Sequence, residues 1–278
     1  MYPTDVAEQA VKLGPYPMSL AAEAPALSGR FPLVVVSHGS GGTPLLHRSL
    51  AAHLARAGFV VALPEHPRNN RTRNDLAGTA SVLADRPKQL RAVIDAVLAD
   101  ERLLPILGER TVAVVGHSLG GFTGLAAAGG RPTAFPHETS DGQPAPVPVE
   151  PDDRIRALVL LAPATPWFMA PGALDDVRAP VLLLSGSQDE ITPFWHAQLV
   201  VDGVPRGVPV DHRVIEGAGH YSFLTPFPAA MASLALPPAQ DPPGFDRPAF
   251  HEQLHIEVVA FLRSTFAQHS GRAGQPSR

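Results

Sequence analysis

The hydrophobic residues of this chain recur in short continuous runs, and segments with helical periodicity separate most of these runs. Continuous runs of roughly four to eight apolar residues are typical of strands that are buried on both faces of a sheet. Strands are therefore predicted at 31–37, 59–63, 111–115, 155–161 and 181–185. A further strand is predicted at 210–215, where polar residues interrupt the apolar ones. A weaker run at 17–22 indicates a possible edge strand.

Apolar residues that repeat at helical spacing predict the helices. The predicted helices cover 45–57, 85–100, 192–200 and 250–266, and a fifth follows residue 118. Strands that alternate with helices are typical of a mainly parallel sheet with helices on both faces. We therefore expect an α/β fold, in a single domain over residues 1–278. Two Pro-rich segments without periodicity, 131–153 and 226–248, are expected to be surface excursions and possible lids.

One strand, turn and helix pattern stands out for its chemistry. Residues 111–128 read TVAVVGHSLGGFTGLAAA, with Ser118 at the apex of a tight turn. This arrangement is that of a nucleophile elbow, in which the serine adopts strained backbone geometry. Gly116 and Gly120 stand where side chains would collide with neighbouring backbone. Because so short a motif also arises by chance, its context must support the assignment.

The context supplies the partners that a serine nucleophile needs. A serine hydroxyl requires a base to take its proton and a group that orients this base. In parallel sheets, ligands bind at the carboxyl ends of the strands. Asp189 directly follows the predicted strand 181–185, and His220 follows 210–215. We therefore expect Ser118 as nucleophile, His220 as base and Asp189 as the orienting acid, with Glu190, Asp175 or Asp176 as the alternatives for that acid.

The developing oxyanion needs hydrogen-bond donors. The backbone N–H groups of Leu119, just after the nucleophile, and of Ser40, in the glycine-rich stretch after strand 31–37, are expected to form this oxyanion hole. His38 and His117 flank it. Bracing of the loops is the plainer interpretation of these two histidines, and a second base or a substrate contact is the alternative.

The motifs SHGSGG, GHSLGG, GSQDEITP and GAGHYSFL occur in this order, and together they resemble the α/β-hydrolase superfamily. The stretches FVVALPEHP and DPPGFDRPAFH narrow the resemblance to its bacterial dienelactone-hydrolase-like and platelet-activating-factor-acetylhydrolase-like branch. The resemblance spans about residues 31–266 and implies an α/β-hydrolase fold with Ser118, Asp189 and His220 as the triad. A dienelactone hydrolase proper is expected to use cysteine as nucleophile. This chain has no cysteine, so that activity is not expected here.

Other side chains near strand ends are candidates for substrate contacts. The aromatic candidates for the pocket are Trp167, Phe168 and Trp195, with ordinary packing as the alternative. Three arginines in the polar loop after strand 59–63 offer charges for a substrate carboxylate, but a solvated, charged loop is the favoured interpretation. They are Arg68, Arg71 and Arg73.

A competing motif lies in the last predicted helix, where residues 251–255 read HEQLH, the pattern of zinc proteases. Its two histidines fall within the apolar arc of the helix, together with Leu254 and Val258. No residue downstream is suitably placed as a third ligand. We therefore interpret His251 and His255 as core or helix-bracing residues, and we predict no metal and no cofactor.

Composition narrows the function further. Hydrophobic residues make up 45% of the chain, and its formal net charge is −4 without a long basic run, which argues against nucleic acid as partner. No apolar run is long enough for a membrane span, and a cytoplasmic location is expected. The expected function is a serine hydrolase that cleaves a small carboxylic ester through an acyl-enzyme. Amide hydrolysis, acyl transfer or a non-catalytic binding role are the alternatives, and the oligomeric state stays open.

Overall fold

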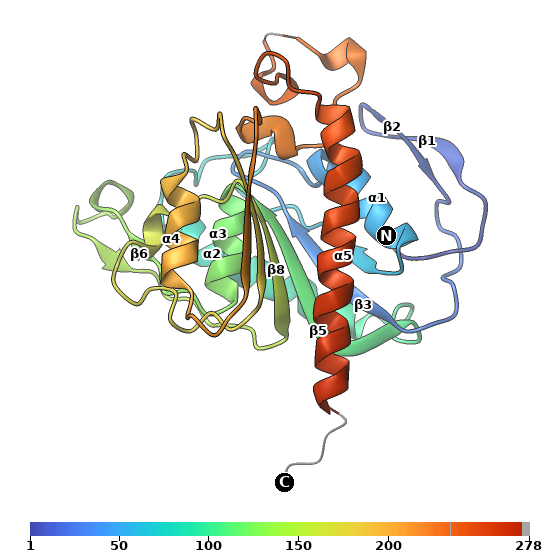
Figure 1. The fold of residues 1–278 in the computed structure, drawn as a ribbon, viewed down its shortest axis with the longest axis horizontal. Helices are drawn as coiled ribbons and strands as arrows, with labels where there is room; N and C mark the ends of the chain where they lie inside the picture. The colour runs from blue at the N-terminus through green and yellow to red at the C-terminus, as the bar shows by residue number, and fades with distance from the viewer. Residues whose placement is uncertain (234, 274–278) are drawn as a thin grey trace.

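The structure is a computed structural model that describes residues 1–233 and 235–273; residue 234, within the second predicted excursion, and residues 274–278 lie outside the described part. Its centre is a six-stranded sheet in the order β10-β9-β8-β5-β3-β4, in which all neighbouring strands run parallel (Figure 1). The strands are β3 (Phe31–Ser37), β4 (Val60–Ala62), β5 (Leu107–His117), β8 (Ile155–Leu161), β9 (Val181–Gly186) and β10 (Val210–Ile215). The predicted α/β fold is therefore confirmed.

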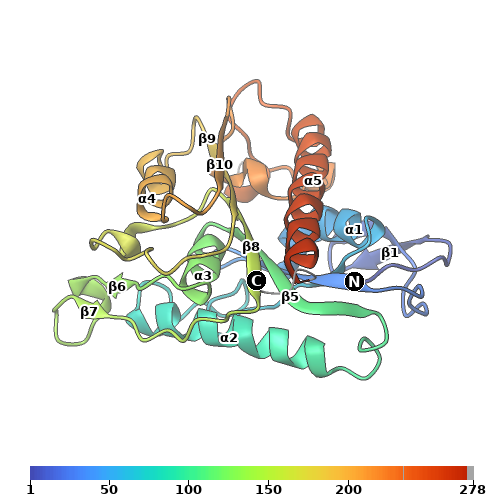
Figure 2. The same cartoon turned by 60° about the horizontal axis from the view of Figure 1, so that its bottom comes forward.

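Helices cover both faces of this sheet (Figure 2). Successive residues of β3 point to opposite faces, so Leu33 packs in one half of the core and Val34 in the other. The first half of the core is closed by α2 (Ala80–Ala99), α3 (Leu119–Ala127) and α4 (Trp195–Gly203). The second half is closed by α1 (Arg48–Arg56) and α5 (Arg247–Ala273). No helix among the described residues is long and apolar enough to cross a membrane.

Several predicted boundaries differ from the structure. The strand expected at 111–115 extends over 107–117, and the helix expected at 192–200 runs from 195 to 203. The helix expected at 85–100 begins at Ala80, after the cap residue Thr79, so Pro87 stands inside α2 rather than in its first turn. Burial of Val82 and Leu83 in the core explains this difference, because tertiary packing outweighs the local preference of proline. The closing helix is also longer than predicted, since it starts at Arg247.

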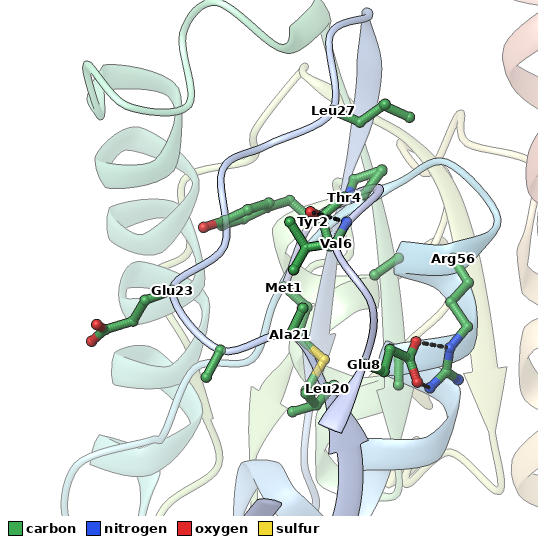
Figure 3. A pocket seen from close by; sticks show the side chains of 14 residues that line it. Met1, Tyr2, Thr4, Val6, Glu8, Leu20, Ala21, Glu23, Leu27 and Arg56 are labelled. Carbon is green, nitrogen blue, oxygen red and sulfur yellow. Dashed lines mark hydrogen bonds and ion pairs between the residues drawn. The ribbon is translucent and has the colours of Figure 1, made fainter. Parts of the chain in front are cut away.

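The N-terminal segment forms a structure of its own beside α1. The possible edge strand at 17–22 does not join the main sheet, because β2 (Tyr16–Leu20) pairs antiparallel with β1 (Gln9–Leu13) in a separate hairpin. This segment is joined to β4 by two hydrogen bonds of 2.7 Å. The N-terminal amino group of Met1 donates to the carbonyl of Val61, and the backbone N–H of Val61 donates to the carbonyl of Met1. A cavity of about 310 Å³ lies between this segment and α1, next to the ion pair between Glu8 and Arg56 (Figure 3).

Short elements occupy the two predicted excursions. Within 131–153, β6 (Thr133–Ala134) pairs with β7 (Ala145–Pro146) around η2 (Pro136–Glu138). Within 226–248, the described residues include η5 (Ala229–Met231) and η6 (Pro237–Ala239). The remaining short elements are η1 (Pro44–His47), η3 (Pro166–Phe168) and η4 (His220–Phe223).

Buried histidines form part of the core between the start of α1 and the inner face of α5. His47 is 2% exposed and His251 is 4% exposed. Burial lowers the pKa of His47 to about 3 and that of His251 to about 4. Nε2 of His47 has no hydrogen-bond partner among the described residues. The fold therefore holds these rings in their neutral form.

The free energy of unfolding is predicted to fall as the pH drops below neutrality. A histidine in the unfolded chain has a pKa near 6.5. Below that pH the unfolded chain therefore binds protons that the folded chain excludes. For each such histidine, the free energy of unfolding then falls by about 1.4 kcal/mol per pH unit. Urea unfolding between about pH 7.5 and 5.5 measures this slope. His47→Gln should flatten it, whereas the exposed control His137→Gln should not. A pH-independent midpoint would contradict the prediction.

Candidate active site

Ser118 occupies the turn between β5 and α3. Its backbone angles are φ 54° and ψ −121°, which lie in a region that residues other than glycine rarely adopt. A Cβ atom at Gly116 would overlap the carbonyl oxygen of Gly120, and a Cβ atom at Gly120 would overlap that of Ser37. The two glycines therefore allow β5, α3 and β3 to pack closely together, with Ser118 at the apex of the turn.

Asp189 and His220 come together at the same edge of the sheet. Asp189 follows β9, and His220 begins η4 after β10. Nδ1 of His220 donates a hydrogen bond of 2.9 Å to Oδ2 of Asp189, and both residues are 6% exposed. Burial raises the pKa of Asp189, but hydrogen bonds from His220 and Thr192 outweigh it and hold the pKa below its ordinary value. Asp189 is therefore an ionised acceptor that orients the imidazole.

The alternative acids lie away from this imidazole. The side chain of Glu190 is exposed to solvent, and so is that of Asp175. Asp176 forms an ion pair with Arg131 on the surface. Among the described residues, Nδ1 of His220 is hydrogen-bonded to Asp189 and Thr192.

Thr192 is a member of this site that the sequence analysis missed. Its hydroxyl donates to Oδ2 of Asp189 at 2.6 Å and lies 3.0 Å from Nδ1 of His220. Its backbone N–H donates to Oδ1 of Asp189 at 2.8 Å. The available signal was local, since a threonine three residues after an aspartate is placed to close a turn on that carboxylate. Thr192 therefore fixes the carboxylate and the imidazole relative to one another.

The two flanking histidines brace the loops. His117 donates from Nε2 to the carbonyl oxygen of His220 at 3.0 Å, and burial holds its pKa well below the ordinary value. His38 donates from Nδ1 to the carbonyl of Gly39 at 2.7 Å and accepts from the backbone N–H of His66. Burial and the charge of Arg86 lower the pKa of His38 to about 3. Both rings are thus hydrogen-bonded to backbone groups, which favours their interpretation as loop-bracing residues.

A cavity of about 380 Å³ opens beside the serine. The residues that line it include Ser118, His117, His220 and Ser40. The other residues of its lining are mainly apolar and include Leu46, Ile191, Leu224, Phe227, Leu236 and Pro238. Three of these residues belong to the segment 226–248, so this excursion forms part of the cavity wall, as a lid segment would.

The aromatic residues predicted for the pocket lie elsewhere. Trp167 and Phe168 pack against Phe122 of α3, with ring centroids 5.0 and 5.4 Å apart, and Trp167 donates to the carboxylate of Glu138. Trp195 stacks on the neighbouring ring of His196. None of the three lines the cavity beside Ser118. Trp167 and Phe168 are held against α3 instead, and Trp195 is exposed at the surface.

The three loop arginines have different surroundings. Arg68 and Arg73 both form ion pairs with Asp75, at 2.5 and 3.0 Å. Arg71 has no ion pair among the described residues and lines the cavity beside Ser118. Its backbone N–H donates to the carbonyl of Gly42 at 2.8 Å, which fixes it next to the glycine-rich loop. Arg71 is the one Asp, Glu, Lys or Arg side chain among the described residues that line this cavity.

The histidines of the HEQLH motif make contacts within the protein. Nε2 of His251 donates to the carbonyl of Ser222 at 3.0 Å. Nε2 of His255 lies 3.3 Å from the hydroxyl of Ser49 in α1. The two rings stand almost perpendicular to each other, with centroids 5.6 Å apart. These contacts tie α5 to α1 and to η4, the segment that begins with His220.

Comparison with known families agrees with this architecture. A model of the alpha/beta hydrolase fold matches residues 32–179, more than half of the chain, and the protein belongs to this family. Members of the family are generally hydrolytic enzymes. The matched segment contains the glycine-rich loop and the Ser118 turn, whereas Asp189 and His220 lie beyond it. No curated protein matches the chain.

Removal of the Thr192 hydroxyl is predicted to slow hydrolysis. Thr192→Val takes one hydrogen bond from a buried, ionised carboxylate, a loss of about 1.4 kcal/mol, so kcat/KM for a model ester should fall about tenfold. Thr192→Ser keeps the hydroxyl and should stay within about threefold of the wild type. Equal rates for the two variants would show that the hydroxyl does not matter.

Proposed function

We propose that this protein is a serine hydrolase that cleaves a carboxylic ester through an acyl-enzyme intermediate. The observation that carries the proposal is the buried hydrogen bond between His220 and Asp189, at the wall of the cavity that Ser118 also lines. A base that is oriented by a carboxylate, beside a serine in a strained turn, is the arrangement that nucleophilic catalysis by serine requires.

The first half of the reaction forms the acyl-enzyme. Because Nδ1 of His220 donates to Asp189, the lone pair of the neutral imidazole is on Nε2, where it accepts the proton of the Ser118 hydroxyl. Oγ of Ser118 attacks the ester carbonyl, and Asp189 stabilises the imidazolium that forms. His220 then gives its proton to the leaving alcohol. A water molecule, activated by His220, afterwards releases the acid and restores the serine.

The backbone supplies donors for the oxyanion. Leu119 is the first residue of α3, and the first N–H groups of a helix have no acceptor within the helix. The positive end of the helix dipole adds to their effect. Ser40 lies in a turn that is closed by the hydrogen bond from Gly42 to Gly39, so its own N–H takes no part in that closure. These two N–H groups are the proposed oxyanion hole.

The cavity indicates the kind of ester. Its modest volume and mainly apolar lining suit a short or medium apolar group, and Arg71 adds a single positive charge to the lining. The preference for an ester over an amide, or over acyl transfer, rests on the resemblance to the bacterial dienelactone-hydrolase-like and platelet-activating-factor-acetylhydrolase-like branch. The absence of a cysteine separates the chain from dienelactone hydrolases proper.

Covalent labelling tests the nucleophile. A fluorophosphonate probe should label the wild-type protein rapidly, because it forms a stable adduct with an activated serine. Ser118→Ala should lose the label completely, whereas Ser81→Ala, at an exposed position in α2, should label like the wild type. Wild-type protein that does not react, or labelling that survives in Ser118→Ala, would overturn the proposal.

Arg71 is predicted to favour esters that carry a negative charge. Arg71→Gln should lower kcat/KM about tenfold for an aryl ester with a carboxylate on its acyl chain and leave a neutral ester of equal length unchanged. Arg68→Gln removes a charge that is already paired with Asp75 and serves as the matched control. The same loss for both esters would assign Arg71 a structural role only.

A further inference from the structure

Arg86 is a cation inside the protein. Its side chain in α2 is fully buried, with 0% exposure, and it is the largest of the fully buried side chains. No carboxylate of the described residues forms an ion pair with it. Burial lowers its pKa to about 9, so the guanidinium is still charged at neutral pH. A buried charge without a counter-charge lowers the stability of the folded protein, so a functional role would explain why the fold contains one.

The guanidinium is held entirely by neutral acceptors. Nη1 donates to Oδ1 of Asn69 at 2.5 Å, and Nε donates to the hydroxyl of Thr123 at 3.0 Å. Nη2 donates to the backbone carbonyl of His38. These acceptors satisfy the hydrogen bonds of Arg86 but leave its positive charge uncompensated.

Each of these acceptors is connected, by a further hydrogen bond or along the chain, to a residue whose N–H group is a proposed oxyanion donor. The hydroxyl of Thr123 donates in turn to the carbonyl of Leu119 at 2.8 Å, in the first turn of α3. Nδ2 of Asn69 donates to the hydroxyl of Ser40 at 3.0 Å. The carbonyl of His38 lies two residues before Ser40 in the chain. Arg86 thus joins the loop after β3 to the start of α3, the two segments that must keep a fixed separation for both N–H groups to meet one oxygen.

We propose that Arg86 is a positioning residue that fixes both oxyanion donors and places an uncompensated positive charge behind the oxyanion hole. Negative charge appears in the hole only when the tetrahedral intermediate forms, so this residue stabilises the transition state more than the bound substrate. The inference rests on the proposed serine hydrolase function. It differs from the role of Arg71, which faces the cavity and acts on the bound substrate.

Steady-state kinetics on a neutral aryl ester tests this inference. Arg86→Gln removes the charge and should lower kcat by about a hundredfold while KM stays within about threefold, because an oxyanion-stabilising interaction is lost in the transition state alone. Arg86→Lys keeps the charge without the planar fork and should lie between Arg86→Gln and the wild type. The affinity for a trifluoromethyl ketone, which forms a charged tetrahedral adduct on the serine, should fall in parallel with kcat.

Arg48 provides the matched control. It is also a buried arginine, and it donates to the backbone carbonyls of Leu45 and Pro226, but its contacts do not reach Ser40 or Leu119. Arg48→Gln should lower the thermal midpoint and leave kcat within about threefold of the wild type. If Arg86→Gln does not fold, kcat and KM of Arg86→Lys are compared with those of Arg48→Gln instead. A fall in kcat that is confined to Arg86→Lys, with KM little changed, would then support the role of Arg86.

The outcomes separate this inference from the proposed function. An active wild-type enzyme whose Arg86 variants keep the wild-type kcat, or change only KM or stability, would overturn the role of Arg86 and leave the serine hydrolase assignment standing. A wild-type protein that neither hydrolyses esters nor reacts with the trifluoromethyl ketone would overturn the assignment itself, and the role of Arg86 with it.

Discussion

The close approach of three backbone segments around Ser118 is the constraint on which the site depends. Gly116 lets β5 pass against Gly120, and Gly120 lets α3 begin against the carbonyl of Ser37 at the end of β3. A side chain at either glycine would push the helix away from the sheet. This contact puts the start of α3 beside the loop after β3, so it brings together the two segments that contain the proposed oxyanion donors. The strained backbone of Ser118 is a consequence of the same packing.

Few charged groups surround Ser118, and they differ in whether a partner of opposite charge accompanies them. Asp189 is the buried acid, and its hydrogen bonds from His220 and Thr192 hold its pKa below the ordinary value. The neighbouring rings of His38 and His117 are held neutral by burial. Arg86 is a buried cation that is hydrogen-bonded to the carbonyl of His38. In a poorly polarisable interior such fixed charges act strongly on a developing oxyanion.

The sequence predicted the sheet well because strands that are buried on both faces are continuous apolar runs. The strand predicted at 155–161, for example, matches β8. The prediction at 210–215 also matches a strand, β10, although this edge strand is only partly buried. Asp189 and His220 could be proposed as partners because each directly follows such a strand. The start of α2 was misplaced, because the position of Pro87 suggested a helix start while burial of the preceding turn decided the outcome. The pocket role of Trp167 was not reproduced, because the chain after β8 turns back onto α3.

The role proposed for Arg86 depends on partners far along the chain, so periodicity and spacing do not reveal it. The link from Thr192 to Asp189, in contrast, could have been read from their spacing of three residues. The central claim is that Ser118, activated by His220, carries the acyl group. Its most direct test is rapid-quench kinetics with a p-nitrophenyl ester, followed by mass spectrometry of the acid-quenched protein. A stoichiometric burst of p-nitrophenolate, with the acyl mass on the peptide that contains Ser118, is the predicted result. Product release without a burst from a protein that stays unmodified at Ser118, and equal rates in Ser118→Ala, would contradict the account.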